Sequence, residues 1–344
     1  MEMALYEPRL GYYRQPEDRP TGGGDFLTAP ETHAIFGWTV ARRIEAMWEE
    51  LGRPRPLSLI EYGAGSGALA LSILEGFRRR GATDLLEAVR YRPIESNPHR
   101  VADLRRRFDE AGQSDILDSA GDGKEPAAGV VIANEFLDAL PVHRATFRGG
   151  KLLELYVVWS DGFAEVADEP STPEFAQRLA DDDVADRLAE GQVVEICLGL
   201  RSWLDDVARR VAVGYFVAID YGYEAADLYG PRRLAGTLLG YRGHRVVEDP
   251  FAEPGLTDLT AHVDFTAARL LAEERGFAAE PLVTQQEFLM AAGLEAELQA
   301  LQASPDLTFT EYVRARSGIV RMLDPRHMGR FRVLIGRRGA RDSA

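Results

Sequence analysis

A glycine-rich turn between an apolar segment and a helical pattern is the feature that most constrains the fold of this chain. The mostly apolar residues 57–60 lead into Gly63, Gly65 and Gly67, and residues 68–74 then repeat apolar side chains as a helix does. Glycine lets the chain reverse tightly and lets a ligand approach the backbone more closely than a Cβ would permit. The order of strand, turn and helix therefore predicts a site for a nucleotide-type cofactor.

Glu61 helps to decide which cofactor binds at this turn. Gly63, Gly65 and Ala68 also fit the pattern of dinucleotide-binding folds, so the glycines alone do not separate the two classes. A carboxylate two residues before the first glycine would lie near a bound pyrophosphate, and like charges about 4 Å apart repel by roughly 4 kcal/mol at an effective dielectric near 20. S-adenosylmethionine (SAM) carries a sulfonium and an ammonium group and no phosphate. We therefore expect SAM, with Glu61 reaching toward its ammonium end, and keep an NAD-dependent oxidoreductase as an alternative.

Two further predicted strands end in polar residues. Residues 91–95 end in Glu95, and the continuous apolar run at residues 129–134 ends in Asn134. Alternating strands and helices predict a doubly wound α/β sheet, in which ligands bind outside the carboxyl ends of the parallel strands. We expect the turn glycines and Asn134 to contact the cofactor there, and Glu95 to accept hydrogen bonds from both ribose hydroxyls. The alternative for Glu95 is an ordinary surface acid.

Two segments interrupt this alternation. Glycine turns at residues 149–150 and 161–162 indicate antiparallel hairpins, and residues 223–263 are rich in glycine and proline. We expect an N-terminal lid loop and helix at 1–56, a core at 57–141, 190–222 and 264–338, and insertions at 142–189 and 223–263 that form the substrate side. In the lid, Asp25 is expected to contact the cofactor, and the alternative is a purely structural loop.

Composition and charge exclude several classes of function. The net charge of −15 argues against binding to nucleic acid or to an anionic membrane, whereas a basic protein partner is compatible with it. No apolar run of about 18 residues predicts membrane insertion, and the single cysteine, Cys197, fits a reducing compartment, so we expect a cytoplasmic protein. The six histidines show no paired metal-ligand spacing, so no metal is expected. Neither a Gly-x-Ser-x-Gly elbow nor a P-loop occurs, which weakens hydrolase and kinase hypotheses.

Several blocks of sequence, spread in order through nearly the whole chain, match one family. They are residues 12–13, 24–31, 61–67, 134–142, 219–222, 236–238 and 258–265. With these blocks the chain resembles the MidA family of SAM-dependent methyltransferases, whose mitochondrial members assist assembly of respiratory complex I. The resemblance implies a class I methyltransferase fold: Rossmann-like, doubly wound and mostly parallel, with seven strands and substrate-side insertions. It also implies that the methyl acceptor is an arginine side chain of a protein substrate.

An arginine acceptor must be held by carboxylates, because its guanidinium stays protonated at neutral pH, with a pKa above about 12. Glu135 and Asp138 lie three residues apart and would project to one side of a helical turn, so we expect them to form the acceptor clamp. In the alternative, Asn134 and Asp138 only cap a turn before Pro141. His262, two residues before Asp264, is expected to act as a base or to bind substrate, although a lone histidine is more often structural.

Three lesser sites and three other functions stay open. Thr28 and Glu31 have the spacing of a capping box, and Asp115 or Asp118 is placed to meet the adenine amino group, unless both are ordinary loop residues. The alternatives to a protein arginine methyltransferase are a small-molecule methyltransferase, a SAM-binding assembly factor without catalysis, and an NAD-dependent oxidoreductase.

Overall fold

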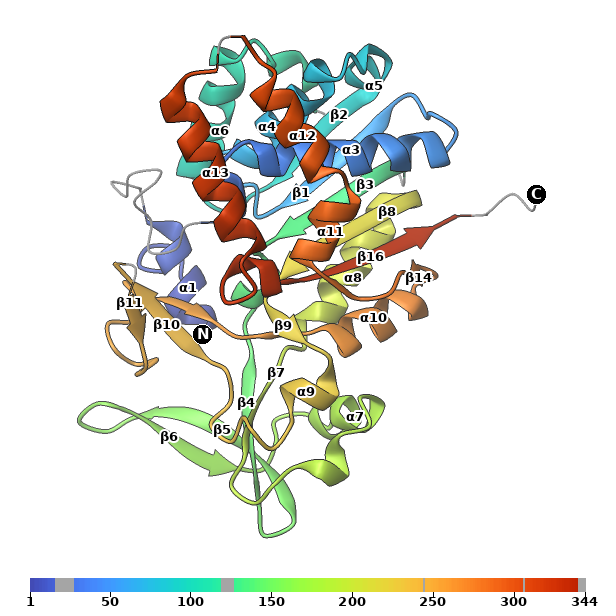
Figure 1. The fold of residues 1–344 in the computed structure, drawn as a ribbon. Helices are drawn as coiled ribbons and strands as arrows, with labels where there is room; N and C mark the ends of the chain where they lie inside the picture. The colour runs from blue at the N-terminus through green and yellow to red at the C-terminus, as the bar shows by residue number, and fades with distance from the viewer. Residues whose placement is uncertain (16–27, 119–126, 244, 306, 340–344) are drawn as a thin grey trace.

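A seven-stranded sheet forms the centre of the computed structural model, which describes residues 1–15, 28–118, 127–243, 245–305 and 307–339 (Figure 1). The strand order is β14-β16-β8-β3-β1-β2, with β15 also paired to β16. Strands β2, β1, β3 and β8 run parallel, and β16 is antiparallel to β8. The bounds are β1 (Leu57–Tyr62), β2 (Val89–Ile94), β3 (Ala127–Asn134), β8 (Val211–Asp220), β14 (Ala278–Ala279), β15 (Val283–Thr284) and β16 (Arg332–Arg338). A mostly parallel sheet therefore carries the chain, as predicted.

The central strands are buried on both faces. In β3, Val130 and Ile132 enter one hydrophobic core while Val131 and Ala133 enter the other. Successive side chains of a strand point to opposite faces, so a strand covered on both sides needs the continuous apolar run seen in the sequence. Helices with core residues on the first face are α3 (Ile35–Glu50), α4 (Ala68–Arg79), α5 (Thr83–Ala88), α6 (Pro98–Glu110), α11 (Gln285–Ala291), α12 (Leu294–Gln302) and α13 (Phe309–Leu323). On the second face they are α8 (Gly199–Arg210) and α10 (Phe265–Glu274), which confirms the doubly wound arrangement.

The first insertion is a separate antiparallel sheet with the strand order β6-β5-β4-β7. Its elements are β4 (His143–Arg148), β5 (Lys151–Trp159), β6 (Phe163–Asp168), α7 (Glu174–Asp181), the 3-10 helix η4 (Ala185–Arg187) and β7 (Val193–Ile196). The hairpins turn at residues 149–150 and 161–162, as the glycines predicted. Strand β7 pairs with β4, so the inserted sheet takes its last strand from beyond residue 189, where we expected the core to resume.

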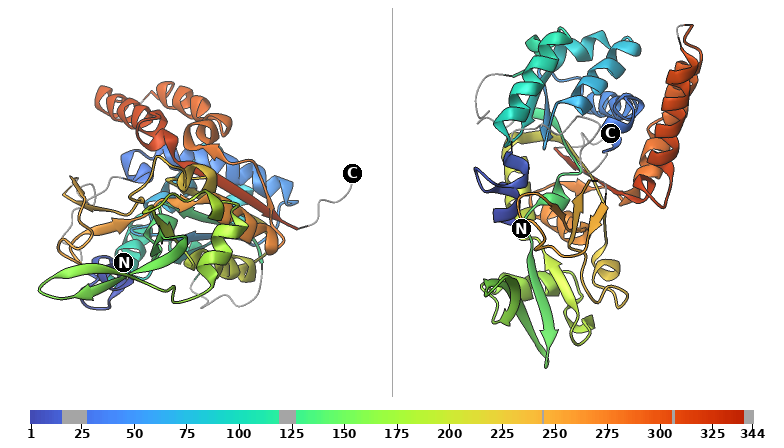
Figure 2. Two further views of the ribbon diagram at one scale, coloured as in Figure 1. Left: turned by 90° about the horizontal axis from the view of Figure 1, so that it is seen from below. Right: turned by 90° about the vertical axis from the view of Figure 1, so that its left-hand side faces the viewer.

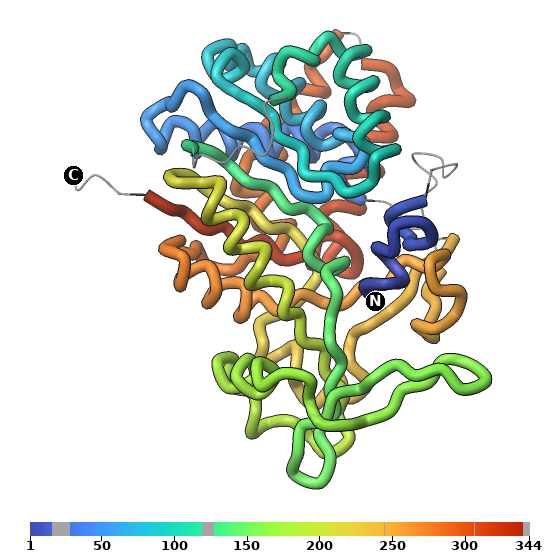
Figure 3. Tube along the Cα trace, turned by 180° about the vertical axis from the view of Figure 1, so that it is seen from behind, coloured from blue at the N-terminus to red at the C-terminus, as the bar shows by residue number. Residues whose placement is uncertain are grey.

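The second insertion and the N-terminal segment lie beside each other at the carboxyl edge of the central sheet (Figures 2 and 3). The insertion contains β9 (Gly222–Tyr223), α9 (Ala225–Leu228), β10 (Leu239–Arg242), β11 (Arg245–Val247), β12 (Asp258–Thr260) and β13 (Val263–Asp264). The N-terminal segment contains α1 (Glu2–Tyr6), the 3-10 helix η1 (Tyr12–Arg14) and α2 (Ala29–Thr32). Three more 3-10 helices are η2 (Ser114–Ile116), η3 (Leu137–Ala139) and η5 (Met328–Arg330).

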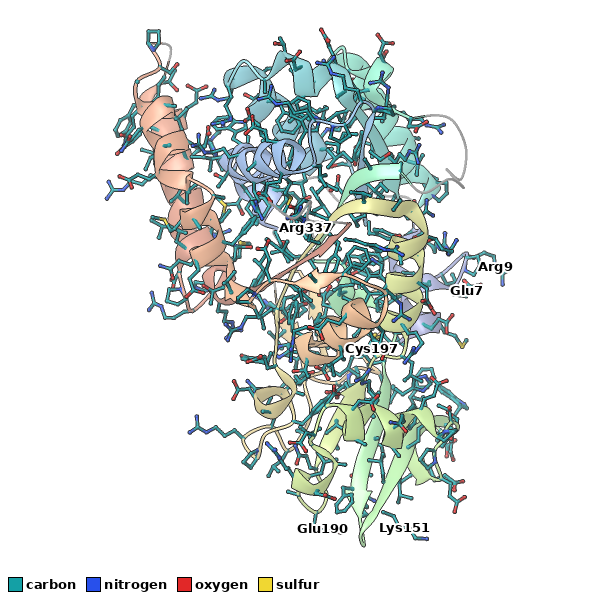
Figure 4. The ribbon with its side chains drawn as sticks, turned by 90° about the vertical axis from the view of Figure 1, so that its right-hand side faces the viewer. Glu7, Arg9, Lys151, Glu190, Cys197 and Arg337 are labelled. Carbon is teal, nitrogen blue, oxygen red and sulfur yellow. The ribbon has the colours of Figure 1, made fainter. Side chains whose placement is uncertain are left out.

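Cys197 lies where the inserted sheet meets the core, whereas Lys151 and Glu190 lie at the outer end of that sheet (Figure 4). Burial raises the pKa of the Cys197 thiol to about 11, so the thiol is protonated and unreactive at neutral pH. No helix among the described residues is long and apolar enough to cross a bilayer.

Candidate cofactor and acceptor site

The glycine turn joins β1 to α4 at the carboxyl end of the sheet. Gly63, Gly65 and Gly67 all have positive φ, at 67°, 52° and 75°, a conformation that favours glycine. A Cβ on Gly67 would lie 2.9 Å from Phe108 and 3.0 Å from Leu104 of α6, so this glycine also permits close packing. No side chain among the described residues caps the N-terminus of α4. Its first N–H groups are therefore available to a ligand, as at other helix N-termini that bind polar groups.

Glu61 lies beneath this turn rather than at its surface. It is 5% exposed, and its Oε2 accepts a hydrogen bond of 2.6 Å from the Tyr91 hydroxyl of β2. Burial raises the pKa of Glu61 to about 8, partly opposed by the Tyr91 hydrogen bond. A nearby cation favours the charged form of such a carboxyl. The position therefore suits a cationic cofactor, although Tyr91 as the partner of Glu61 could not be read from the sequence.

Glu95 connects the turn to the end of β2. Its Oε2 accepts from the Gly65 N–H at 2.9 Å and its Oε1 accepts from the Asn97 N–H at 2.8 Å. Asn97 in turn caps α6 by accepting from the His99 N–H. Each carboxylate oxygen can accept more than one hydrogen bond, so these contacts leave capacity for a ribose. The structure thus brings Glu95 against the glycine turn, where the prediction required it.

Asn134 ends β3, and Glu135 follows it in a strained conformation. Glu135 has a φ of 50°, which is uncommon for a residue with a side chain and typical of functional sites. Its Oε1 accepts from the Asn134 side-chain amide and from the Ala29 N–H, both at 3.1 Å. Within the part of the chain that the structure describes, Oδ1 of Asn134 and Oε2 of Glu135 are buried and accept no hydrogen bond. Burial raises the pKa of Glu135 to about 8.

Asp220, which the sequence analysis did not assign, organises the loop that carries Asp138. Its Oδ2 accepts three backbone N–H bonds, from Phe136, Leu137 and Asp138, at 2.9–3.2 Å. The Asp138 carboxylate accepts from the Tyr221 hydroxyl, and burial raises its pKa to about 6. Glu135 and Asp138 both raise the pKa of Asp220 after the larger effect of burial, so the three carboxylates form one cluster. The signal for Asp220 was its position at the end of an apolar strand, the same signal that identified Asn134.

Tyrosines of the N-terminal segment lie beside Asp138 and Asp258. The Tyr6 hydroxyl donates to the Ala139 carbonyl at 2.9 Å, and the Tyr13 hydroxyl donates to Asp258 of β12 at 2.6 Å. The rings of Tyr6 and Tyr13 lie 5.6 Å apart. Burial, followed by the charges of Asp138 and Asp258, raises the pKa of Tyr6. The N-terminal segment therefore covers the carboxylate cluster with hydrogen-bonded tyrosines.

His262 lies beside this cluster. Its ring is 5.5 Å from both the Tyr221 and Tyr223 rings, and its Nδ1 is buried with no partner in the described ranges. Burial lowers the pKa of His262 to about 4, helped by Arg233 and Arg330, so the ring is neutral near pH 7. Asp264 does not orient it, because that carboxylate caps α10 and accepts from Tyr229. A neutral ring offers a donor and an acceptor to a ligand.

Three minor predictions have different outcomes. Thr28 precedes α2, but its side chain makes no capping hydrogen bond, so the predicted capping box is wrong. Asp118 pairs with Arg92 at 2.6 Å, next to a single bridge between Leu117 and Tyr91. Asp25 lies outside the described residues.

The polar groups of the site together fit a ligand that carries positive charge. Carboxylates gather at the carboxyl edge of the sheet, where two buried oxygens and one ring nitrogen have no hydrogen-bond partner among the residues that the structure describes. Buried polar atoms are normally hydrogen-bonded, so atoms left without partners mark where a ligand supplies them. Pyrophosphate has only acceptor oxygens and adds negative charge, so it cannot supply the donors that these carboxyls lack, which disfavours a dinucleotide.

Comparison with known proteins agrees with this chemistry. Residues 39–282 match the model of a family described as "Putative S-adenosyl-L-methionine-dependent methyltransferase". The chain belongs to this methyltransferase family. Its fold, its cofactor SAM and the resemblance noted from the sequence are thereby confirmed. Assignment to the family also removes the NAD-dependent oxidoreductase from consideration.

The relatives of this methyltransferase include curated proteins and a solved structure. A Danio rerio protein, "Protein arginine methyltransferase NDUFAF7, mitochondrial", is 28% identical over 89% of this chain and 75% of its own length. The Drosophila melanogaster homologue of that protein is 30% identical over 97% of this chain and 79% of its own length. A Burkholderia thailandensis protein, solved bound to S-adenosyl-homocysteine (SAH), superimposes with a TM-score of 0.87 at 30% identity, covering 100% of this chain and 87% of that one.

Proposed function

We propose that this methyltransferase transfers a methyl group from SAM to an arginine side chain of a protein. The observation that carries the proposal is the pair of buried oxygens without donors, Asn134 Oδ1 and Glu135 Oε2, beside the Asp138 carboxylate. A guanidinium is planar, always charged, and presents five N–H donors, so it can satisfy several such acceptors at once. The names of the Danio rerio and Drosophila melanogaster relatives support the same acceptor.

Each residue of the site has a role in this reaction. Gly63, Gly65 and Gly67 let the backbone contact the cofactor, and Glu95 binds its ribose. When bound, SAM supplies an activated methyl group on its sulfonium, and the acceptor nitrogen receives this methyl and releases one proton. Glu135 and Asp138 hold the guanidinium and orient one nitrogen toward the methyl, and orientation alone contributes about 7–11 kcal/mol in well-positioned systems.

Glu135 is also the group that takes the released proton. Burial raises the pKa of this carboxyl to about 8. The bound guanidinium holds Glu135 in its charged form, and when methyl transfer releases a proton, the carboxylate accepts that proton readily at neutral pH. His262 faces the same cluster in its neutral form and serves as a second hydrogen-bonding group for the acceptor. The N-terminal tyrosines exclude water from the cluster.

The test is transfer of labelled methyl from SAM to the protein fraction of a lysate from cells that lack this gene, followed by mass spectrometry for methylarginine. Glu135→Gln keeps the size of the side chain but removes its charge. We therefore expect the rate of methyl transfer to fall roughly 30-fold to several thousand-fold, which corresponds to about 2–5 kcal/mol. Its matched control is Glu248→Gln, which removes one charge from an exposed position of the second insertion. Affinity for SAH should change by no more than about threefold in either variant.

Three outcomes would contradict the proposal. Label in the small-molecule fraction would indicate a small-molecule methyltransferase. Binding of SAM without transfer to any fraction would indicate an assembly factor that holds its partner without catalysis. Transfer to a protein residue other than arginine would retain the class of reaction and reject the acceptor.

A further inference from the structure

The hairpin of β5 and β6 projects beyond the rest of the inserted sheet (Figures 1 and 3). One face of this hairpin carries exposed apolar side chains: Trp159 is 71% exposed, Val157 55% and Phe163 45%. In the register of the hairpin Trp159 pairs with Phe163, and their rings lie 4.9 Å apart. Contiguous exposed apolar surface of this kind marks an interaction site in soluble proteins. We call this surface the hairpin patch: Val157, Trp159 and Phe163.

Strand β6 is also a free sheet edge. It is the outer strand of the order β6-β5-β4-β7, and within the described ranges it pairs only with β5. Proteins normally protect such an edge with proline, lysine or an inward-facing charge, and Phe163–Asp168 contains neither proline nor lysine. Its Glu165 is already engaged by Arg144. The edge is therefore suited to accept an extended segment of another chain as an added strand.

Charge indicates what kind of segment fits. Residues 157–169 carry four acidic residues and no basic one, and residues 245–256 carry three acidic residues and one basic residue. The two segments meet, because the Phe163 ring stacks on Phe251 at 5.8 Å. An apolar patch within an acidic surface favours a partner that is basic and apolar, and disfavours both anionic lipid and a second copy of this acidic chain.

The hairpin patch is connected to the acceptor cluster by one loop. This loop runs from Phe251 to Asp258, which accepts the Tyr13 hydrogen bond beside Asp138. Seven residues span at most about 25 Å when fully extended, so Phe251, which contacts the patch, lies within that distance of Asp258. A somewhat longer substrate segment, in extended form, can therefore bind the patch and reach the site at the same time.

We propose that the hairpin patch docks a basic, extended segment of the acceptor protein. This segment lies near the acceptor arginine in the substrate's sequence and pairs with the free edge of β6 as an added strand. This inference rests on the proposed function for the identity of the partner. Docking outside the reaction centre contributes to affinity for the protein substrate and leaves the chemical step unchanged, so it affects the half-saturating concentration and not the maximal rate.

Trp159 supplies a direct readout of docking, because the other three tryptophans, Trp38, Trp48 and Trp203, are only 4–5% exposed. Quenching of tryptophan fluorescence by acrylamide therefore reports mainly on Trp159. The probes are a heptapeptide of alternating arginine and valine, and its glutamate and valine counterpart. We expect the arginine peptide to reduce the quenching constant about twofold at low salt, and the glutamate peptide to leave it unchanged.

The second arm measures transfer of labelled methyl against the concentration of lysate protein. In Trp159→Ser/Phe163→Ser we expect the half-saturating concentration to rise about tenfold while the maximal rate stays within about twofold. The matched control, Phe309→Ser/Val320→Ser, removes two exposed apolar side chains from α13 and should change neither quantity. Equal heat stability of the variants would exclude unfolding as the cause.

The two proposals fail in different ways. Transfer to arginine with an unchanged half-saturating concentration in the hairpin variant would overturn docking and leave the function intact. Shielding of Trp159 by the arginine peptide without any methyl transfer would retain docking and overturn the function. Two further results would overturn the proposal of a basic partner. They are shielding of Trp159 that increases with enzyme concentration in the absence of peptide, and equal shielding of Trp159 by both peptides.

Discussion

In the reaction that we propose, the donor half and the acceptor half of the site are built in different ways. The proposed donor half consists of Gly63, Gly65, Gly67 and Glu95, and it depends mainly on the backbone conformation of one turn. The proposed acceptor half consists of Glu135, Asp138, Asp220 and His262, whose buried or half-buried side chains are held by contacts between distant segments. One half can thus be damaged while the other is spared.

The difference also concerns charge. Burial raises the pKa of Glu135, Asp138 and Asp220, so these carboxyls keep their protons to higher pH than exposed carboxyls do. A cationic ligand shifts that balance toward the charged carboxylates. Beside the donor half, burial also raises the pKa of Glu61. Ligand binding is therefore coupled to proton release in the acceptor half more than in the donor half.

Asp220→Ala is expected to break the acceptor half most strongly. It leaves three buried N–H groups of the loop at residues 136–138 without their acceptor, at a cost of about 1–3 kcal/mol for each group that water does not reach. We expect methyl transfer to fall by a factor of about 1,000 or more and SAH affinity to stay within about threefold. Asp220→Asn keeps one acceptor oxygen, so its rate of methyl transfer should lie between those of the wild type and of Asp220→Ala. Parallel losses of transfer and SAH affinity would show that the halves are not separable.

Gly67→Ala is expected to break the donor half. Its Cβ would meet Phe108 and Leu104 at a φ of 75°, whereas the same change at Gly52, with a φ of 78°, meets nothing within 4 Å. Left-handed backbone costs alanine about 1–2 kcal/mol in both variants, and overpacking adds about 1–3 kcal/mol only at Gly67. Calorimetry should show SAH affinity reduced about 100-fold in Gly67→Ala and unchanged in Gly52→Ala. Equal affinities would mean that the turn tolerates displacement.

The same contrast decides how much the sequence could reveal. The turn, the ends of β1, β2 and β3, and the hairpins at residues 149–150 and 161–162 follow from local patterns, and strand order then places Glu95 beside Gly65. The partners Tyr13 and Asp258 are 245 residues apart, and no local pattern pairs them. Tyr91, which donates a hydrogen bond to Glu61 from the neighbouring strand, could likewise not be identified as its partner from the sequence.

Two predictions near the site show why neighbouring sequence is a poor guide to partners. Spacing suggested that Thr28 caps its helix and that Asp264 assists His262. In the structure the Ala29 N–H donates to Glu135, 106 residues away, and Asp264 serves α10 and Tyr229. The Thr28 side chain makes no local capping bond, whereas Asp264 combines a local bond from the Ala267 N–H with a contact from the distant Tyr229. Spacing along the chain alone therefore does not identify the partner of either residue.

The smallest expected effect tests whether Glu61 belongs with the donor half. Its pKa is raised from an ordinary 4.5 to about 8 by burial, so between these values the folded protein binds a proton that the unfolded chain has lost. The stabilisation from this group is therefore full below about pH 4.5 and is lost as pH rises to about 8, by up to about 1.4 kcal/mol per pH unit.

Glu61→Gln keeps an acceptor for the Tyr91 hydroxyl and does not titrate. Denaturant unfolding of both proteins without ligand should give similar stability at pH 4.5 and a more stable variant at pH 8.5, while SAH affinity at pH 8.5 falls about tenfold in the variant if the carboxylate faces the ammonium group. Because the other buried carboxyls titrate alike in both proteins, stability curves that stay parallel across this range would place Glu61 outside the charge balance of the site.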